Sequence, residues 1–142
     1  MAKKMVYLSG MMDGVSVEDG NTWRLKATEF FRHAGWEVYN PYDGKSKDKA
    51  EYTKYTPNEI FHRDIYYLDK CDVVLVNLDI PESIKNSKIP FFTIGEMFLA
   101  HRDRKPVVAY TNCLSGRAGY EAIVTKTLPD LDACMDYIIE NF

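Results

Sequence analysis

The pattern of apolar and polar residues along the chain predicts strands that alternate with helices. Residues 5–9, Met-Val-Tyr-Leu-Ser, form a short apolar run that predicts a buried strand. Five apolar residues then recur at the spacing of one helical face and predict a helix: Trp23, Ala27, Phe30, Phe31 and Ala34. Gly35 follows them, at the position where a glycine commonly ends a helix.

The rest of the chain continues this alternation. Residues 36–40 predict a second strand, and Pro57 opens a helix that runs to Lys70. Residues 73–78, Val-Val-Leu-Val-Asn-Leu, are a nearly continuous apolar run, which is typical of a central parallel strand. The remaining predicted segments are loops over 42–56 and 79–92, a helix over 93–104, strands over 106–110 and 123–128, and a last helix opened by Pro129 and Asp130.

Such an alternation predicts one α/β domain over residues 1–142, with a parallel sheet of about five strands between two helical layers. This is the three-layer arrangement of Rossmann and flavodoxin-like folds, in which ligands bind outside the carboxyl ends of the strands. That rule selects the loops after residues 9, 40, 78 and 110, together with the helix starts that follow them.

Composition and charge narrow the possible functions. The chain has 142 residues and a net charge of -3, and its Lys and Arg residues form no stripe, which argues against nucleic-acid binding and leaves a small-molecule ligand open. The apolar run near the N-terminus is too short for a signal peptide or a membrane span, so we expect a cytoplasmic protein without a membrane partner. Three isolated cysteines and three scattered histidines predict neither a disulfide framework nor a metal site.

Three carboxylates are predicted at the carboxyl edge of the sheet. Asp64 shares the apolar face of its helix, where a buried carboxylate is costly unless it is functional or paired with Arg63 or Lys70. Asp79 follows the central strand, where it is either a ligand-binding residue or a simple loop cap. Glu96 is predicted in the first turn of its helix, where the helix dipole favours a carboxylate whatever its role.

Small and hydroxyl-bearing residues accompany these carboxylates. Ser9 offers a hydroxyl at the end of the first strand, and Gly10 lets backbone approach a ligand closely, although an ordinary turn would also explain both. Thr93 and Gly95 precede Glu96, and the small glycine leaves room for a substrate. We therefore predict that all four residues contact a ligand.

Paired carboxylates at one sheet edge suit the cleavage of a glycosidic bond. One carboxylate attacks the anomeric carbon or stabilises positive charge there, and another handles the proton that the leaving group needs. An attacking carboxylate needs a neighbouring group that orients it. Tyr7, on the adjacent strand, is the candidate for that role, and a purely structural core aromatic is the alternative.

Three stretches together resemble the nucleoside 2-deoxyribosyltransferase family: residues 7–10, Arg63-Asp64 followed by residues 68–75, and residues 93–96. The similarity runs from residue 5 to about residue 110. It implies that Glu96 attacks the anomeric carbon and forms a covalent deoxyribosyl-enzyme. It also implies that Asp64 donates and accepts protons, and that Tyr7 positions Glu96. Ser9, Gly10, Asp79, Thr93 and Gly95 are the expected substrate-binding residues.

The resemblance also implies a reaction and its partners. Deoxyribose passes from a deoxynucleoside to a second free nucleobase, without a metal or an organic cofactor, in a homodimer or larger homo-oligomer whose sites a neighbouring chain completes. The chain departs from the family at Pro90, close to where the transferases commonly place an aspartate that reads the base.

Two alternatives remain open at the level of sequence. The sister group of this family hydrolyses deoxynucleoside 5'-monophosphates, and Ser9, Ser16 and Arg24 could form a phosphate site, whereas Asp13 would repel a phosphate by about 1 kcal/mol. A non-enzymatic receiver-like or nucleotide-sensing domain would also place an aspartate, here Asp79, after its third strand. That reading leaves Asp64 and Glu96 unexplained.

Overall fold

A computed structural model describes residues 2–42, 55–86 and 90–142 of the chain, so the predicted loop over 42–56 lies almost entirely outside the described residues. Five strands form one sheet in the order β2-β1-β3-β4-β5, and every neighbouring pair is parallel. The strands are β1 (Met5–Gly10), β2 (Glu37–Tyr39), β3 (Val73–Leu78), β4 (Val107–Thr111) and β5 (Lys126–Thr127). The predicted α/β fold class is confirmed.

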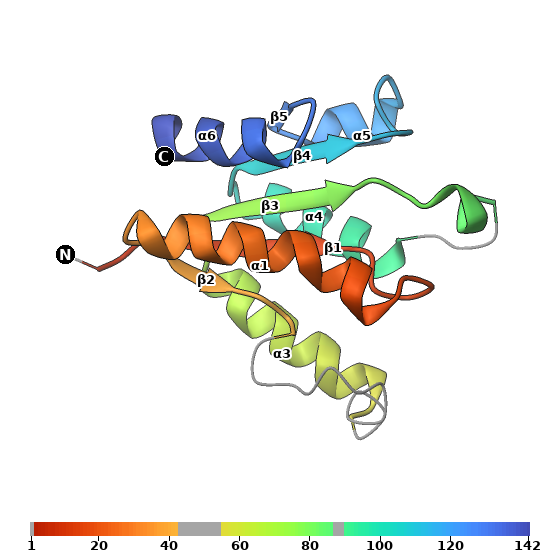
Figure 1. The fold of residues 1–142 in the computed structure, drawn as a ribbon, viewed down its shortest axis with the longest axis horizontal. Helices are drawn as coiled ribbons and strands as arrows, with labels where there is room; N and C mark the ends of the chain where they lie inside the picture. The colour runs from red at the N-terminus through yellow and green to blue at the C-terminus, as the bar shows by residue number, and fades with distance from the viewer. Residues whose placement is uncertain (1, 43–54, 87–89) are drawn as a thin grey trace.

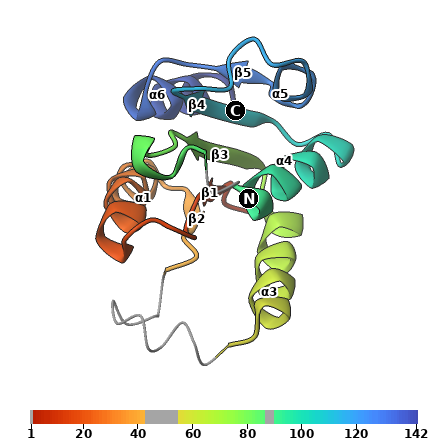
Figure 2. The same ribbon diagram turned by 90° about the vertical axis from the view of Figure 1, so that its right-hand side faces the viewer.

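Helices cover both faces of the sheet (Figure 1). Figure 2 shows α1 (Val17–His33) and α6 (Leu131–Asn141) on one side of it. The opposite side carries α3 (Pro57–Lys70), α4 (Phe91–Arg102) and the short α5 (Ala118–Ile123). A 3-10 turn, η1 (Glu82–Ile84), follows β3 in the segment that leads to α4. No helix among the described residues is long and apolar enough to cross a membrane.

Alternating side chains of the strands build two separate cores, because successive residues of a strand point to opposite faces. On β1, Val6 and Leu8 pack under α1 and α6, together with Phe31 and Ile138. Tyr7 points the other way, into the core under α3 and α4. Its neighbour on β2 is Tyr39, at the same level of the sheet, so the two phenol rings lie side by side on the α3 side.

Two predicted elements have the bounds that the sequence indicates. Thr56 caps α3 by accepting a hydrogen bond from the Glu59 amide at 3.1 Å, and Pro57 occupies the first turn. The apolar run that predicts a central strand is β3, whose neighbours on either side are β1 and β4. Gly35 has a φ of +87°, as expected of a glycine that ends a helix.

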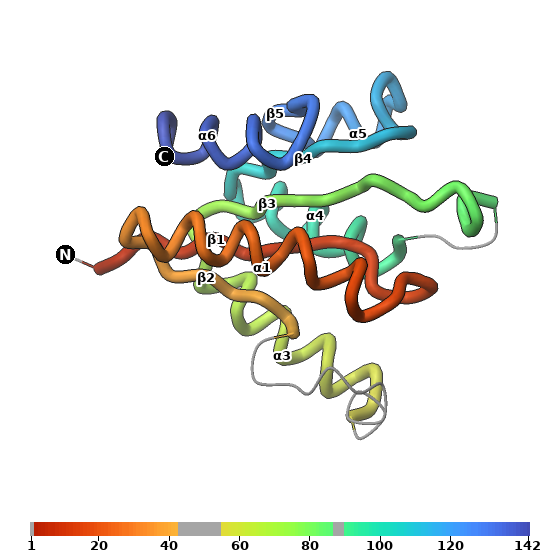
Figure 3. Tube along the Cα trace, in the orientation of Figure 1, coloured from red at the N-terminus to blue at the C-terminus, as the bar shows by residue number. Residues whose placement is uncertain are grey.

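Two other predictions are wrong in their bounds. α4 begins at Phe91 and not at residue 93, so Glu96 lies in the second turn of the helix and not in the first. The fifth strand is only Lys126–Thr127, because the chain up to Ile123 forms α5 instead. The trace in Figure 3 shows the loops that follow β1 and β3 leaving the sheet at the same end, close to the start of α4.

Candidate active site

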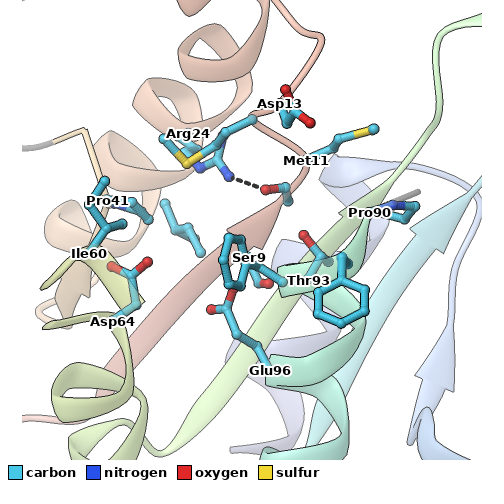
Figure 4. A pocket seen from close by; sticks show the side chains of 15 residues that line it. Ser9, Met11, Asp13, Arg24, Pro41, Ile60, Asp64, Pro90, Thr93 and Glu96 are labelled. Carbon is cyan, nitrogen blue, oxygen red and sulfur yellow. Dashed lines mark hydrogen bonds between the residues drawn. The ribbon is translucent and has the colours of Figure 1, made fainter. Parts of the chain in front are cut away.

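A cleft of about 320 Å³ opens at the carboxyl edge of the sheet, where the end of β1 faces the helices α3 and α4. Five of the residues proposed from sequence line it: Ser9, Gly10, Asp64, Thr93 and Glu96. Figure 4 shows Asp64 and Glu96 approaching the cleft from two different helices, α3 and α4. The volume of the cleft lies in the range of small-molecule sites.

Glu96 is buried, with 6% of its surface exposed. Because α4 has no acidic residue in its first turn, the helix dipole does not explain this carboxylate. Burial raises the pKa of Glu96 from 4.5 to about 8, and the nearby Asp64 carboxylate adds to this rise, while Tyr7 and Arg24 oppose it. Its Oε2 atom has no hydrogen-bond partner among the described residues.

Tyr7 lies below the cleft and does not line it, since its side chain is completely buried in the centre of the sheet. Burial raises the pKa of Tyr7 well above its ordinary value, and the Glu96 and Asp64 carboxylates raise it further. The phenol therefore keeps its proton and is a potential donor. Within the described part of the chain its hydroxyl has no hydrogen-bond partner, although it is close enough to Glu96 for each group to shift the other's pKa.

Asp64 is tied into a small network at the wall of the cleft. The Tyr39 hydroxyl donates a 2.7 Å hydrogen bond to Asp64 Oδ1, and Arg63 Nη2 lies 3.8 Å from the same oxygen. The sequence had left open whether Asp64 is functional or paired with Arg63. In the structure Asp64 both lines the cleft and forms an ion pair with Arg63. Lys70, the other candidate, instead lies over the ring of Tyr66 at 4.3 Å.

The end of β1 is shaped by packing against α1. A Cβ on Gly10 would lie 2.7 Å from Trp23 and 3.2 Å from Arg24, so α1 itself demands a glycine there. The Ser9 hydroxyl is buried and has no hydrogen-bond partner among the described residues. Ser9 therefore places a polar group at the floor of the cleft, close enough to Glu96 to lower its pKa.

Two expected substrate-binding residues do not line the cleft. Asp79 is exposed, because its amide is bound to Asn77 Oδ1 at 2.9 Å and the next residue, Ile80, is paired with the side chain of Asn112 through two 3.0 Å hydrogen bonds. These bonds direct the chain after β3 toward β4 and away from the cleft. Gly95 lies on α4, and nothing stands within 4 Å of the position that a Cβ would occupy.

From the sequence, Arg24 was expected only as one part of an alternative phosphate-binding site. In the structure its side chain lines the cleft and is fully buried. Its Nη2 donates to the Gly10 carbonyl at 2.8 Å, and Nη1 donates to the Gly20 carbonyl. The guanidinium lies over the rings of Trp23 at 4.6 Å and Tyr42 at 5.2 Å. The signal in the sequence was its spacing, since Arg24 shares the apolar face of α1 with the buried residues at 27 and 31.

The apolar wall of the cleft was not predicted from the sequence. Phe91 and Phe92, in the first turn of α4, line the cleft although 77% and 52% of their surfaces are exposed. Phe92 packs against Phe61 of α3 with ring centroids 5.5 Å apart, and Met11 lines the cleft from the loop after β1. A flat, apolar group would bind well between such side chains.

The molecule thus has a three-layer fold with three carboxyl groups, those of Asp13, Asp64 and Glu96, in an otherwise largely apolar cleft. Among the described residues, no group of three or more His, Cys, Asp and Glu residues is placed to hold a metal ion. Residues 3–113 match the family described as nucleoside 2-deoxyribosyltransferase like. Since this match covers more than half of the chain, the protein belongs to that family.

Two solved structures show the same fold. A conserved protein from Enterococcus faecalis V583 is 15% identical, with a TM-score of 0.67 over 99% of this chain and 100% of that chain. A 2-deoxyribosyltransferase from the psychrotolerant bacterium Bacillus psychrosaccharolyticus is also 15% identical, with a TM-score of 0.60 over 97% of this chain and 91% of that one. Comparison with curated proteins found no match.

Proposed function

We propose that this protein cleaves the N-glycosidic bond of a 2'-deoxyribonucleoside and transfers the deoxyribose to a second nucleobase, through a covalent intermediate on Glu96. The observation that carries this proposal is the convergence of Glu96 and Asp64, from two helices, on one cleft of the right size for a nucleoside. Membership of the nucleoside 2-deoxyribosyltransferase-like family supports it. We also propose that residues 1–142 act as one domain of this kind.

The reaction is a double displacement at the anomeric carbon. A carboxylate oxygen of Glu96 forms a bond to C1', and the bond from C1' to the base nitrogen breaks with its electron pair on the base. Asp64 gives the departing base its proton. A nitrogen of the second base then attacks C1', the ester to Glu96 breaks, and Asp64 takes back the proton that the incoming base loses. Water in place of the second base gives hydrolysis.

The raised pKa of Glu96 provides the proton that this series of reaction steps needs. With a pKa of about 8, Glu96 is largely protonated at neutral pH, whereas the attack requires its carboxylate. Burial is the main cause of that raised pKa, and the Asp64 charge adds to it, so the protonation of Glu96 depends on the charge of Asp64. Transfer of this proton from Glu96 to Asp64 creates both the nucleophile and the acid at once.

The remaining groups in the cleft and directly below it fit a deoxynucleoside. Tyr7, below Glu96, is a protonated donor that orients the attacking carboxylate. The hydroxyls of Ser9 and Thr93 offer hydrogen bonds to the sugar, and Phe92 offers a face on which a base can stack. We further propose a homo-oligomer, because Phe91 and Phe98 leave 77% and 53% of their surfaces exposed on α4.

A second function, hydrolysis of deoxynucleoside 5'-monophosphates, is favoured by one observation. The guanidinium of Arg24 lines the cleft near the loop after β1, where a phosphate would add its charge. Asp13 lines the same part of the cleft and opposes this reading, and two nitrogens of Arg24 are already bound to backbone carbonyls. We therefore place the nucleoside first.

The test is a base-exchange assay. The protein is incubated with a deoxynucleoside and a different free base, and separately with a deoxynucleoside 5'-monophosphate, and the products are separated by chromatography. We expect a new nucleoside in the first reaction. Release of free base from the monophosphate alone would establish the hydrolase instead. No product in either reaction, over a panel of pyrimidine and purine substrates, would refute both functions.

A further inference from the structure

Tyr39 and Arg63 form a hydrogen-bonded chain that ends on Asp64. Arg63 Nε donates to the Tyr39 hydroxyl oxygen at 3.1 Å, and that hydroxyl donates to Asp64 Oδ1 at 2.7 Å. Arg63 Nη2 also donates to the carbonyl of Pro41 at 3.2 Å, which ties the guanidinium to the chain after β2. Tyr39, at the end of β2, thus holds the carboxylate of Asp64, which belongs to α3.

The direction of this chain is fixed by the chemistry of its members. A guanidinium has donors only, so the Tyr39 oxygen must accept from Arg63. The single proton of the phenol then points to Asp64, whose Oδ1 is the acceptor. Burial and the hydrogen bond to Asp64 raise the pKa of Tyr39 far above its ordinary value, so the phenol keeps this proton throughout the physiological range.

Tyr39 itself is held rigidly. Its ring stacks on Tyr67 of α3 with centroids 4.2 Å apart and an interplanar angle of 11°, and it packs against Tyr7 at 5.0 Å. The sheet register places Tyr7 and Tyr39 side by side on neighbouring strands. The aromatic stack therefore fixes the spacing between the phenol below Glu96 and the phenol behind Asp64.

We propose that Tyr39, oriented by Arg63, is a positioning residue that holds Asp64 by its Oδ1 atom and so fixes the orientation of its carboxyl group for proton transfer to and from the base. This inference rests on the proposed function and gives Tyr39 and Arg63 a role in it.

The test is a double-mutant cycle of Tyr39→Phe and Asp64→Asn, measured as kcat/KM in base exchange. Tyr39→Phe keeps the stacked ring and removes only the hydroxyl. We expect it to lower kcat/KM by about 10- to 100-fold when Asp64 is present and by less than about 3-fold in the Asp64→Asn background. Where turnover of Asp64→Asn is too slow to follow, the same cycle is measured as deoxynucleoside affinity in Glu96→Gln.

The matched control is Tyr120→Phe, which removes a similarly buried phenol whose hydrogen bond to Thr127 is also 2.7 Å long. We expect this control to lose stability to a comparable degree while keeping its kcat/KM. Equal effects of Tyr39→Phe with and without Asp64, or an effect no larger than that of the control, would overturn the inference and leave the proposed function intact. An inactive wild-type protein would instead refute the proposed function, and this inference with it.

Discussion

Replacing Glu96 with glutamine is expected to lower the rate of deoxynucleoside cleavage by about a thousandfold or more, because the amide cannot form the covalent bond to C1'. The change keeps the size of the side chain and its place in the second turn of α4. Steady-state release of base from a deoxynucleoside measures the loss. Substrate affinity should change much less than the rate, since the nucleophile acts on the reacting carbon and not on binding.

Glu29→Gln is the matched control for this result. Glu29 lies on α1, on the other side of the sheet from α4, and is exposed, so the same chemical change should leave the rate within about twofold of wild type. If Glu96→Gln kept more than about a tenth of wild-type activity, the assignment of the nucleophile would be wrong.

Glu96→Gln is also expected to stabilise the folded protein at alkaline pH, by a few kcal/mol. Glu96 has its pKa raised from 4.5 to about 8 by burial, so the folded state holds a proton that the unfolded state has lost in this window. Its stabilising contribution is complete below pH 4.5 and is lost as the pH rises toward 8, at about 1.4 kcal/mol per pH unit. A glutamine at this position is neutral at every pH, so its contribution to the free energy of unfolding does not change as the pH rises.

Urea unfolding at a series of pH values measures this difference. The free energies of unfolding of wild type and Glu96→Gln should be similar near pH 5 and should diverge steadily up to about pH 8, with the variant more stable. The Glu29→Gln control should run parallel to wild type. Parallel curves for Glu96→Gln as well would show that Glu96 titrates normally, and Glu96 could then not be the source of the proton in the mechanism.

The fold could be predicted because local signals and burial agree along most of the chain. Pro57 and its capping neighbour Thr56 fix the start of α3, and the apolar run of β3 could be accommodated only in the middle of a sheet. α4 was harder, since Phe91 and Phe92 lack an N-cap signal and are largely exposed in the structure. That error matters for function, because it had offered the helix dipole as an explanation for Glu96.

The candidate site could be predicted only where a strand end or a helix face determines it. Ser9, Asp64 and Glu96 follow from such rules, and the structure brings them to one cleft. Asp79 obeys the same strand-end rule but is diverted by a local hydrogen bond to Asn77 and by Asn112, whose hydrogen bonds to Ile80 are tertiary contacts that no local pattern encodes.

Tyr39 was missed for a related reason, and Arg63 was expected only as an ion-pair partner of Asp64. Their roles come from the register between β1 and β2 and from the position of α3 beside it, which set Tyr39 next to both Tyr7 and Asp64. A sequence shows that β2 ends in a tyrosine, but the residue opposite it is fixed only once the strands pair.

The covalent intermediate is the central claim, and mass spectrometry tests it most directly. The protein is mixed with a deoxynucleoside in the absence of an acceptor base, quenched rapidly in acid, digested and analysed. We predict that the peptide containing Glu96 gains the mass of one deoxyribosyl group, with the bond on the Glu96 carboxyl, and that Glu96→Gln gains none. Release of base from an unmodified protein, or an adduct on another residue such as Asp64, would contradict the account.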